Sequence, residues 1–478
     1  MGNNNQNQPI TQIDLTAIRS ELIKIPAGEI GHENVFSEIL ENLSPIDFEE
    51  YANLEEKERV SQKLKLVLTI QAILQTAKAL NCGLCRNLDF LFAYNGAYWK
   101  LTDSNELENF LADCAKVVGV DWLNANYYRF RRELLKQFWA TAYLPTPKAD
   151  FDKVLINLRN GTFEIKGSEK FLRPFDRNDF LTYQLEFDFD ENADFRKWQL
   201  FLDEVLPERE KQIILSEFMG YVFARHLKLE KTLLLFGSGA NGKSVVFNVI
   251  KALFGPESIS HFSLESLGHE YHRAKIANKL LNYSSDISFN LKADIFKILT
   301  SGEPVEARLP YGQPMVLDNY ARLMFNSNHL PRDVEHSHAY FRRFLIIPFE
   351  VTISEEHQNK HLAKEIVETE LSGVFNWMLE GLERLLKRGN FSECKSSENA
   401  LNQYKLESDS VAMFLKEENF RPSTNHTMTI AEIFAEYREY ARQVGLRPLG
   451  RNNFAKRLES NGIARFDSSK PHFLIEKF

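Results

Sequence analysis

Residues 231–255 have the sequence KTLLLFGSGANGKSVVFNVIKALFG, and this stretch decides the fold. It begins with a short apolar run, Thr232–Phe236, that has the length of a buried strand. The pattern Gly-x4-Gly-Lys-Ser follows. Apolar residues then recur at helical spacing up to Gly255, and glycine commonly ends a helix. This order predicts a strand, a glycine-rich loop and a helix, which indicates an α/β domain.

The residue types of this loop suit the phosphates of a nucleoside triphosphate. Glycines allow backbone N–H groups to surround a phosphate, and the amino end of the next helix adds partial positive charge. We expect Lys243 to reach the β- and γ-phosphates of ATP, and the hydroxyl of Ser244 to bind Mg²⁺. The alternative is a glycine-rich turn that binds nothing. The predicted phosphate-binding residues are Gly237, Ser238, Gly239, Ala240, Asn241, Gly242, Lys243 and Ser244.

Three polar residues follow the loop in the order that an ATPase needs. Asp286 lies 43 residues after Lys243, Asn328 lies 42 residues later, and Arg343 lies 15 further on. ATP hydrolysis uses an acid for Mg²⁺ or water, a polar sensor, and often an arginine from a neighbouring subunit. Asp286 and Asn328 end predicted strands, where an α/β sheet places its ligand. Each residue alone is ordinary at a strand end, but the ordered set indicates ATP hydrolysis.

Composition limits the class of protein. The 478 residues suggest about three domains, and 44% hydrophobic and 26% charged residues are usual for a globular chain. No apolar run is long enough to span a membrane and the first residues lack a signal-peptide pattern, so we expect no membrane partner. Four cysteines favour a reducing compartment, the cytoplasm. We expect Cys82 and Cys85 to lie in a helix turn rather than to bind zinc.

The charge is unevenly distributed along the chain. Its formal net charge is −8, and residues 1–60 hold four Lys/Arg against twelve Asp/Glu. Residues 421–478 hold ten Lys/Arg against six Asp/Glu, so the mean charge does not exclude DNA binding.

Two further clusters allow alternative interpretations. The basic and aromatic run Tyr127–Arg132 suits single-strand binding, but we favour an ordinary amphipathic helix. Asp188 and Asp190 would share one face of a strand, as in a two-metal polymerase site, but no other part of such a site follows. We therefore expect a solvated strand end there.

Several motifs resemble the superfamily 3 helicases, the AAA+ type ATPases of small viruses, phages and plasmids. The similarity is greater to phage and plasmid primase-helicases related to the poxvirus primase-helicase. It covers about two-thirds of the chain, from Leu155 to about Glu476. The matching text includes INLRNGTFEI, EFDFDENADFRKW, GSGANGKS, NYSSDIS, LTSGEPVEARLPYGQP, MFNSNHLP, FRRFLIIPF, FNWMLEGLERLL and FAKRLESNGI.

The resemblance implies a role for each matching residue. Lys243 and Ser244 are then Walker A, Asp286 is the Walker B acid that holds Mg²⁺ with Ser244, and Asn328 is the sensor. Arg343 takes the position of the arginine finger, with Arg342 as its accessory. In related helicases a hairpin at the position of residues 308–313 binds DNA in the channel of a hexameric ring. Here its candidate contacts are Arg308 and Tyr311.

The implied fold is α/β, with an AAA+ type ATPase flanked by a mainly helical N-terminal region and a C-terminal winged helix. The expected domains are 1–150 (helical, a collar or partner-binding region), 151–205 (a small α+β linking segment), 206–390 (ATPase), 391–410 (linker) and 411–478 (winged helix). Four basic residues of the last domain are expected to bind DNA: Arg447, Arg451, Lys456 and Arg457.

The sequence departs from the family's pattern at two places. The Walker B position has the single acid Asp286 where many relatives have Asp-Glu, and the hairpin tip lacks lysine. The favoured function is an ATP-driven DNA helicase of a phage, prophage or plasmid in a bacterial host. Its expected partners are single-stranded and forked DNA, further copies of the chain, and a separate primase or single-strand-binding protein. The alternatives are an initiator or loader ATPase at an origin, and a primase-helicase that uses Asp188 and Asp190.

Overall fold

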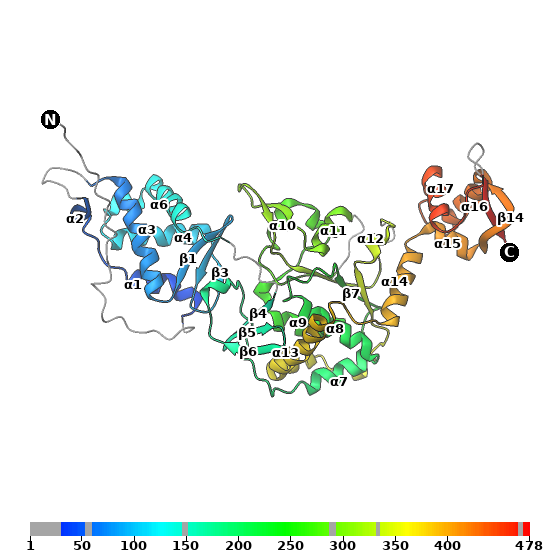
Figure 1. Ribbon diagram of the computed structural model, residues 1–478, viewed down its shortest axis with the longest axis horizontal. Helices are drawn as coiled ribbons and strands as arrows, with labels where there is room; N and C mark the ends of the chain where they lie inside the picture. Colours follow the sequence, from blue (N-terminus) through cyan, green and yellow to red (C-terminus); the bar gives the residue numbers. More distant parts are fainter. Residues whose placement is uncertain (1–29, 53–59, 146–151, 286–292, 331–334, 467–471) are drawn as a thin grey trace. The chain divides into compact units, whose positions relative to one another are not determined.

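The structure is a computed structural model that describes residues 30–52, 60–145, 152–285, 293–330, 335–466 and 472–478 (Figure 1). The chain divides into two compact units. Unit 1 comprises Met1–Pro145 with Phe175–Arg177, and unit 2 comprises Thr146–Pro174 with Asn178–Phe478.

Unit 1 combines helices with a small antiparallel sheet in the order β1-β2-β3. A turn at Asn95-Gly96 joins β2 to β3. The expected helix turn at Cys82 and Cys85 is wrong, because Cys85 lies in β1 and Cys82 directly precedes it. The elements are α1 (Val35–Glu41), α2 (Phe48–Ala52), α3 (Gln62–Ala79), β1 (Gly83–Asn87), β2 (Phe90–Tyr94), β3 (Trp99–Leu101), α4 (Ser104–Val117), α5 (Trp122–Asn126) and α6 (Tyr128–Thr141).

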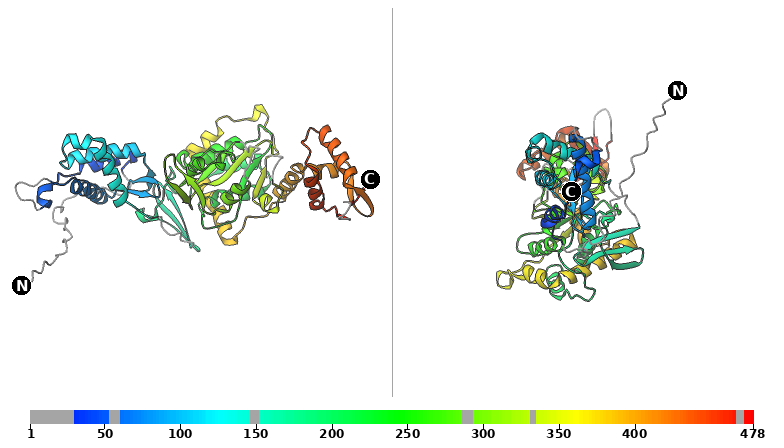
Figure 2. Two further views of the ribbon diagram at one scale, coloured as in Figure 1. Left: turned by 90° about the horizontal axis from the view of Figure 1, so that it is seen from above. Right: turned by 90° about the vertical axis from the view of Figure 1, so that its left-hand side faces the viewer.

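Unit 2 is built on a parallel five-stranded sheet in the order β13-β7-β12-β9-β8 (Figures 1 and 2). Its strands are β7 (Thr232–Phe236), β8 (Ile259–Ser260), β9 (Leu281–Ser284), β12 (Arg322–Ser327) and β13 (Phe344–Pro348). The strand β7 that leads into the glycine-rich loop has neighbours on both sides. This confirms the expected α/β class.

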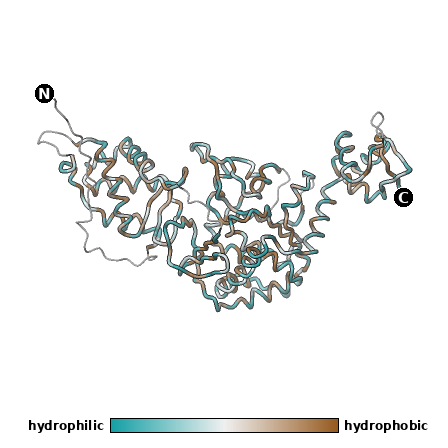
Figure 3. The backbone as a smooth tube through the Cα atoms, viewed as in Figure 1, coloured by the Kyte–Doolittle hydropathy of each residue, from teal (hydrophilic) through white to brown (hydrophobic). Residues whose placement is uncertain are grey.

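Apolar side chains alternate across this sheet, so helices can cover both of its faces. Leu233 and Leu235 of β7 join the core formed with α8 (Arg209–Tyr221), α9 (Lys243–Phe254) and α13 (Leu362–Arg388). On the other face, Phe344 of β13 stacks on Phe296 of α11 (Ala293–Ser301), with ring centroids 5.0 Å apart. Hydrophobic segments accordingly gather inside unit 2 (Figure 3).

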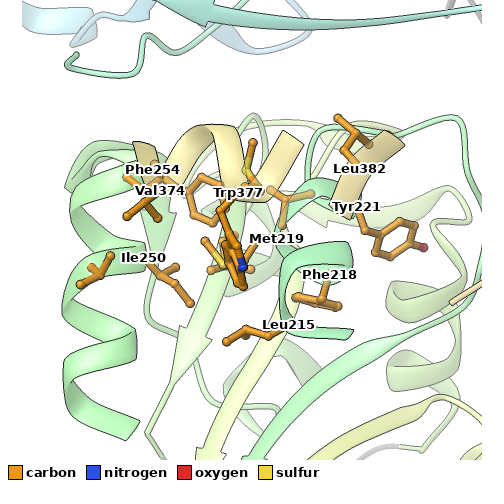
Figure 4. Packing of buried hydrophobic residues seen from close by; sticks show 14 of the residues in the cluster. Leu215, Phe218, Met219, Tyr221, Ile250, Phe254, Val374, Trp377 and Leu382 are labelled. Carbon is orange, nitrogen blue, oxygen red and sulfur yellow. The ribbon is translucent and has the colours of Figure 1, made fainter. Parts of the chain in front are cut away.

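Helices α8 and α13 cross at a close distance because small residues lie at the contact. A Cβ on Gly220 would lie 2.6 Å from Leu382 Cβ, and one on Gly381 would lie 2.4 Å from the carbonyl carbon of Ser216. Figure 4 shows Phe218 and Met219 of α8 beside Trp377 of α13. This packing fixes α9, and hence the glycine-rich loop, against the sheet.

Residues 152–174 and 178–205 lie in the same compact unit as the predicted ATPase region and contribute to this core. They form a second sheet, β4-β5-β6, and α7, whose buried side chains belong to the same cluster as those of α8 and α9. A tight turn at Asn160-Gly161 joins β4 to β5. These elements are β4 (Lys153–Leu158), β5 (Gly161–Lys166), β6 (Glu169–Arg173) and α7 (Arg196–Val205).

The expected linker 391–410 contains a helix, α14 (Lys395–Glu407). Its Tyr404 is 1% exposed and packs edge-on against Phe341 and Phe344, with ring centroids 5.4 and 5.7 Å away. The Ser- and Glu-rich composition suggested a linker, but one tyrosine anchors the segment to β13.

The described residues of 410–478 form three helices and an antiparallel strand pair around their own core. The helices were expected, whereas β14 was missed because most of its side chains are exposed and polar. The elements are α15 (Ser410–Glu417), β14 (Phe420–Thr429), α16 (Ile430–Gln443), α17 (Arg451–Ser460) and β15 (His472–Lys477). The other elements of unit 2 are α10 (Glu270–Ala274), β10 (Val305–Arg308), β11 (Pro314–Leu317) and α12 (His338–Phe341).

Candidate nucleotide-binding site

The glycine-rich loop lies between β7 and α9, as the sequence predicts. Gly242 has φ 84°, and Ala240 also has a left-handed backbone with φ 57°. A Cβ on Gly237 would lie 2.3 Å from the carbonyl oxygen of Phe349, so only glycine fits there. Such backbone strain is characteristic of functional loops.

Two contacts close the base of the loop. The Ile353 N–H donates to Ala240 O at 2.8 Å, and the Asn241 amide, 3% exposed, donates to Phe349 O at 3.3 Å. The outer side is open, since a Cβ on Gly239 would meet nothing within 4 Å. The loop is therefore fixed at its base and accessible where a phosphate would enter.

Lys243 is a buried cation at the first position of α9. Its Nζ donates to Gly237 O at 2.7 Å, Ser238 O at 2.8 Å and Asn241 Oδ1 at 2.9 Å. Among the described residues no carboxylate forms an ion pair with it, and burial lowers its pKa. An anion in the loop would compensate this charge, so the residues present fit a nucleotide phosphate.

Ser244, the next residue, is exposed on the first turn of α9. Its predicted companion Asp286 lies outside the described residues. The Ser244 side chain is accessible to solvent at the amino end of α9, and its predicted contact with Mg²⁺ stays a prediction.

The carboxyl ends of β7, β12 and β9 meet at one edge of the sheet. Phe236 pairs with Ser327, and Ser284 pairs with Phe325. The predicted sensor Asn328 directly follows β12 and is exposed at this edge. The structure thus brings Asn328 and the loop to the same edge.

Sequence reasoning missed Asn326, two residues earlier on β12. Its Oδ1 is buried and has no hydrogen-bond partner in the described part of the chain. Its amide bonds the hydroxyl of Tyr283, whose ring stacks on Phe247 of α9 at 3.5 Å. The sequence signal that could have identified Asn326 is an asparagine inside an apolar strand, because a buried polar side chain needs a hydrogen-bond partner.

Arg342 and Arg343 lie at the opposite edge of the sheet. Phe344 pairs with Thr232, the first residue of β7, so Arg343 is level with Lys231 and about 20 Å along the strand from Gly237, where the loop begins. Neither arginine reaches the loop of its own chain, so a role in ATP hydrolysis requires a second copy.

Burial distinguishes the two arginines. Arg343 is 6% exposed and binds Glu230 at 3.1 Å and Ser301 Oγ at 2.9 Å. The side chain of Arg342 is 48% exposed and also contacts Glu230. Sequence reasoning did not anticipate Glu230, which holds both.

The predicted DNA-binding hairpin is β10–β11. Tyr311 at its tip is 101% exposed and has φ 63°, an uncommon backbone for tyrosine. Arg308 Nε donates to Gly312 O at 2.9 Å, so this side chain also stabilises the turn.

The four predicted basic residues of the C-terminal region do not have equal surroundings. Arg447, Arg451 and Lys456 are exposed. Arg457 is partly buried, with Nε 3.8 Å from Asp409, the N-cap residue of α15. Arg457 therefore has a structural contact, and the other three are accessible to a ligand.

Asp188 and Asp190 do not share the face of a strand, because residues 186–190 are irregular. Asp188 pairs with Arg159 at 3.0 Å, and Asp190 Oδ1 accepts from the backbone N–H of Asn192 at 2.9 Å. The expected strand end is therefore wrong. Within the described residues no group of three or more His, Cys, Asp or Glu could hold a metal ion.

Two family models match parts of the chain. Residues 84–207 match the family described as D5 N terminal like, and residues 235–343 match a family of unknown function, DUF5906. The second match contains the glycine-rich loop and the hairpin.

A curated relative is the protein named putative helicase L207/L206 of Acanthamoeba polyphaga mimivirus. It is 23% identical over 255 residues, which are 50% of this chain and 26% of the relative. The chain thus spans about a quarter of that relative's length.

Among solved structures, the chain is similar to the C-terminal region of NrS-1. An apo structure of its residues 305–718 has a TM-score of 0.48 at 12% identity, covering 89% of this chain and 100% of that one. An A form apo structure of this region has a TM-score of 0.47 at 11% identity, covering 89% and 100%. No described helix has the length and apolar character of a membrane span.

Proposed function

We propose that the chain is an ATP-dependent DNA helicase of the superfamily 3, AAA+ type, acting in the replication of a phage, plasmid or other mobile element. The observation that carries the proposal is the loop between β7 and α9, which encloses the buried Lys243 cation without an acidic partner among the described residues. The similarity to a relative named putative helicase favours unwinding over other uses of ATP.

Bound ATP with Mg²⁺ would supply the free energy of the cycle and a γ-phosphate open to attack by water. Lys243 would exchange its contacts with Gly237 O and Ser238 O for phosphate oxygens. Ser244 and Asp286 would hold the cation, and Asn326 and Asn328 would respond to the γ-phosphate from the end of β12.

Hydrolysis in this proposal occurs between subunits of a ring, which we take to be a hexamer. Since Arg342 and Arg343 lie at the far edge of the sheet, each would serve the loop of a neighbouring copy. We assign the direct contact to Arg342, because Arg343 would first have to leave Glu230 and Ser301. The β10–β11 hairpins would contact the strand inside the ring through Tyr311 and Arg308.

The C-terminal region would act as a winged helix that binds duplex or forked DNA. Its exposed residues Arg447, Arg451 and Lys456 favour this role. They also favour a second candidate function, an initiator ATPase that binds an origin with little unwinding.

A forked-duplex assay separates the two functions. We expect strand displacement that requires ATP and is lost in Lys243→Ala. Lys251→Ala is the matched control, because Lys251 is exposed on the same helix. ATP-dependent origin binding by the wild type without displacement would support the initiator and contradict the helicase.

A further inference from the structure

The corner between α5 and α6 in unit 1 carries exposed aromatic and basic side chains that the proposed function does not use. Trp122 and Leu123 are each 70% exposed, Tyr127 is 46% and Tyr128 is 52% exposed. Tyr127 is both the C-cap of α5 and the N-cap of α6, so the two helices meet at this residue. We call the exposed side chains of residues Trp122–Arg132 the aromatic corner.

The exposed side chains of α6 are not part of a core. Phe130, Leu134 and Phe138 recur every four residues and are buried in unit 1. Tyr128, Arg132 and Lys136 recur at the same spacing on another side and are exposed. A spacing of four residues places successive side chains about 6 Å apart along the helix.

The charges of the aromatic corner are available for a ligand. Arg131 pairs with Glu108 at 3.3 Å, but among the described residues neither Arg129 nor Arg132 forms an ion pair. Both guanidinium groups instead lie near the ring of Tyr128, at 5.8 and 5.7 Å from its centroid.

The nearby acids are engaged in other contacts. Glu133 accepts a hydrogen bond from Gln62 Nε2 at 2.8 Å, and Asp121 caps α5 by accepting from the Leu123 and Asn124 N–H groups. Residues 121–141 hold four Lys/Arg and two Asp/Glu. The corner is therefore locally positive in a chain whose formal net charge is −8.

We propose that the aromatic corner binds a single-stranded polynucleotide. Bases would stack on Tyr128, Tyr127 and Trp122, and phosphates would contact Arg129 and Arg132. Exposed rings beside guanidinium groups that form no ion pair among the described residues suit sequence-tolerant single-strand binding, because every base has a stacking face and every nucleotide a phosphate. This contact is additional to the hairpin and the C-terminal region, and it needs no ATP.

Fluorescence anisotropy of the full chain with labelled (dT)30 and (rU)30, without nucleotide, tests the proposal. We expect Tyr128→Ala to weaken binding about 10-fold, whereas Tyr128→Phe binds like the wild type because it keeps the ring. Arg132→Gln should reduce the slope of log Kd against log salt by about 0.7. Equal losses of affinity for (dT)30 and (rU)30 would show that the aromatic corner recognises features shared by DNA and RNA. A loss of affinity for (dT)30 alone would identify DNA as the ligand.

Matched controls are Lys78→Gln and Tyr143→Ala, which change exposed residues elsewhere in unit 1. Photocrosslinking with 5-iodouracil oligonucleotides should label the peptide that contains Tyr127 and Tyr128. Unchanged affinity in Tyr128→Ala, or crosslinks confined to Tyr311, would overturn the proposal. So would loss of the oligomer in mass photometry with unchanged affinity, which would assign the corner to a protein interface.

Discussion

Lys243 is placed where a cation is unfavourable until an anion binds. Its three hydrogen bonds go to two carbonyls and one amide oxygen, and burial lowers its pKa. Nucleotide-free protein should therefore be more stable without this charge, whereas the nucleotide complex should depend on it.

We expect Lys243→Met to raise the free energy of unfolding of the nucleotide-free protein by about 1 kcal/mol, because it removes an uncompensated buried charge. Wild-type protein should gain about 2.7 kcal/mol from ATP at 100 times Kd, and the variant should gain nothing. Thermal unfolding with and without Mg-ATP measures both effects, with Lys251→Met as the control. A variant that ATP still stabilises would contradict the role of Lys243.

Substitutions of the adjacent residues Arg342 and Arg343 should affect stability and catalysis differently. Arg342→Ala removes a half-exposed side chain, so we expect a loss of stability below about 1 kcal/mol but ATP turnover reduced at least 100-fold. Arg343→Ala leaves the buried hydroxyl of Ser301 without its arginine partner and removes one of the two arginines at Glu230, so it should cost about 2 kcal/mol.

Mixing experiments locate the site of action. Arg342→Ala subunits keep an intact loop, and Lys243→Ala subunits keep an intact arginine, so mixed rings should recover activity. Recovery in no mixture, by a coupled ATPase assay, would exclude action in trans.

His32 should make unit 1 sensitive to acid. Burial, with a smaller effect of Lys100, lowers its pKa from 6.5 to about 4, and its Nε2 lies 3.2 Å from Ala93 O and Tyr98 O. Between these pKa values the unfolded chain binds more protons, so stability falls as pH falls.

At pH 5 the loss relative to pH 8 should be about 2 kcal/mol. His32→Gln should lack this component, and the difference between the two proteins in urea titrations at each pH isolates it. The same pH dependence in both would show that His32 is not its source.

At the scale of elements, the sequence predicted the strand before the glycine-rich loop, the strands that precede Asp286 and Asn328, and the hairpin around residue 311. Apolar runs of strand length are local signals. The sequence failed for β14, whose side chains are mostly exposed, and for α14, whose anchor is one buried tyrosine. Both depend on tertiary contacts that no local pattern encodes.

The candidate nucleotide-binding site shows the same limit, because local sequence patterns do not reveal tertiary contacts. Motif spacing predicted that the loop and Asn328 lie at one edge of the sheet, because carboxyl ends of parallel strands converge. It gave no indication that Arg343 is buried against Glu230, or that Asn326 has an unpartnered oxygen. These properties arise from packing between distant segments.

The β10–β11 hairpin should tolerate changes that abolish unwinding. Tyr311→Gly relieves a left-handed backbone, which costs about 1 kcal/mol for a residue with a side chain, so stability should not fall. Strand displacement should drop at least 10-fold while ATP turnover without DNA stays unchanged. The control is Val316→Thr, an exposed position on the same hairpin. Normal displacement by Tyr311→Gly would exclude the hairpin from DNA contact.

At the scale of the whole molecule, the two units and the C-terminal region have separate cores, but α14 ties the last connection to the sheet. The place of a truncation therefore decides its effect. A chain ending at Asp409 keeps Tyr404 packed on Phe341 and Phe344. A chain ending at Cys394 lacks Tyr404 and therefore uncovers the rings of Phe341 and Phe344.

We expect residues 1–409 to hydrolyse ATP like the full chain and to bind duplex DNA at least 10-fold more weakly, because Arg447, Arg451 and Lys456 are gone. Residues 1–394 should lose stability as well, and Tyr404→Ala in the full chain should reproduce about 3 kcal/mol of that loss. ATPase rates, duplex affinity and thermal unfolding of the three proteins separate these effects. If residues 1–409 bind duplex DNA with the affinity of the full chain, the C-terminal region does not bind DNA. A stable 1–394 would instead mean that α14 contributes nothing to the sheet it covers, which its buried tyrosine argues against.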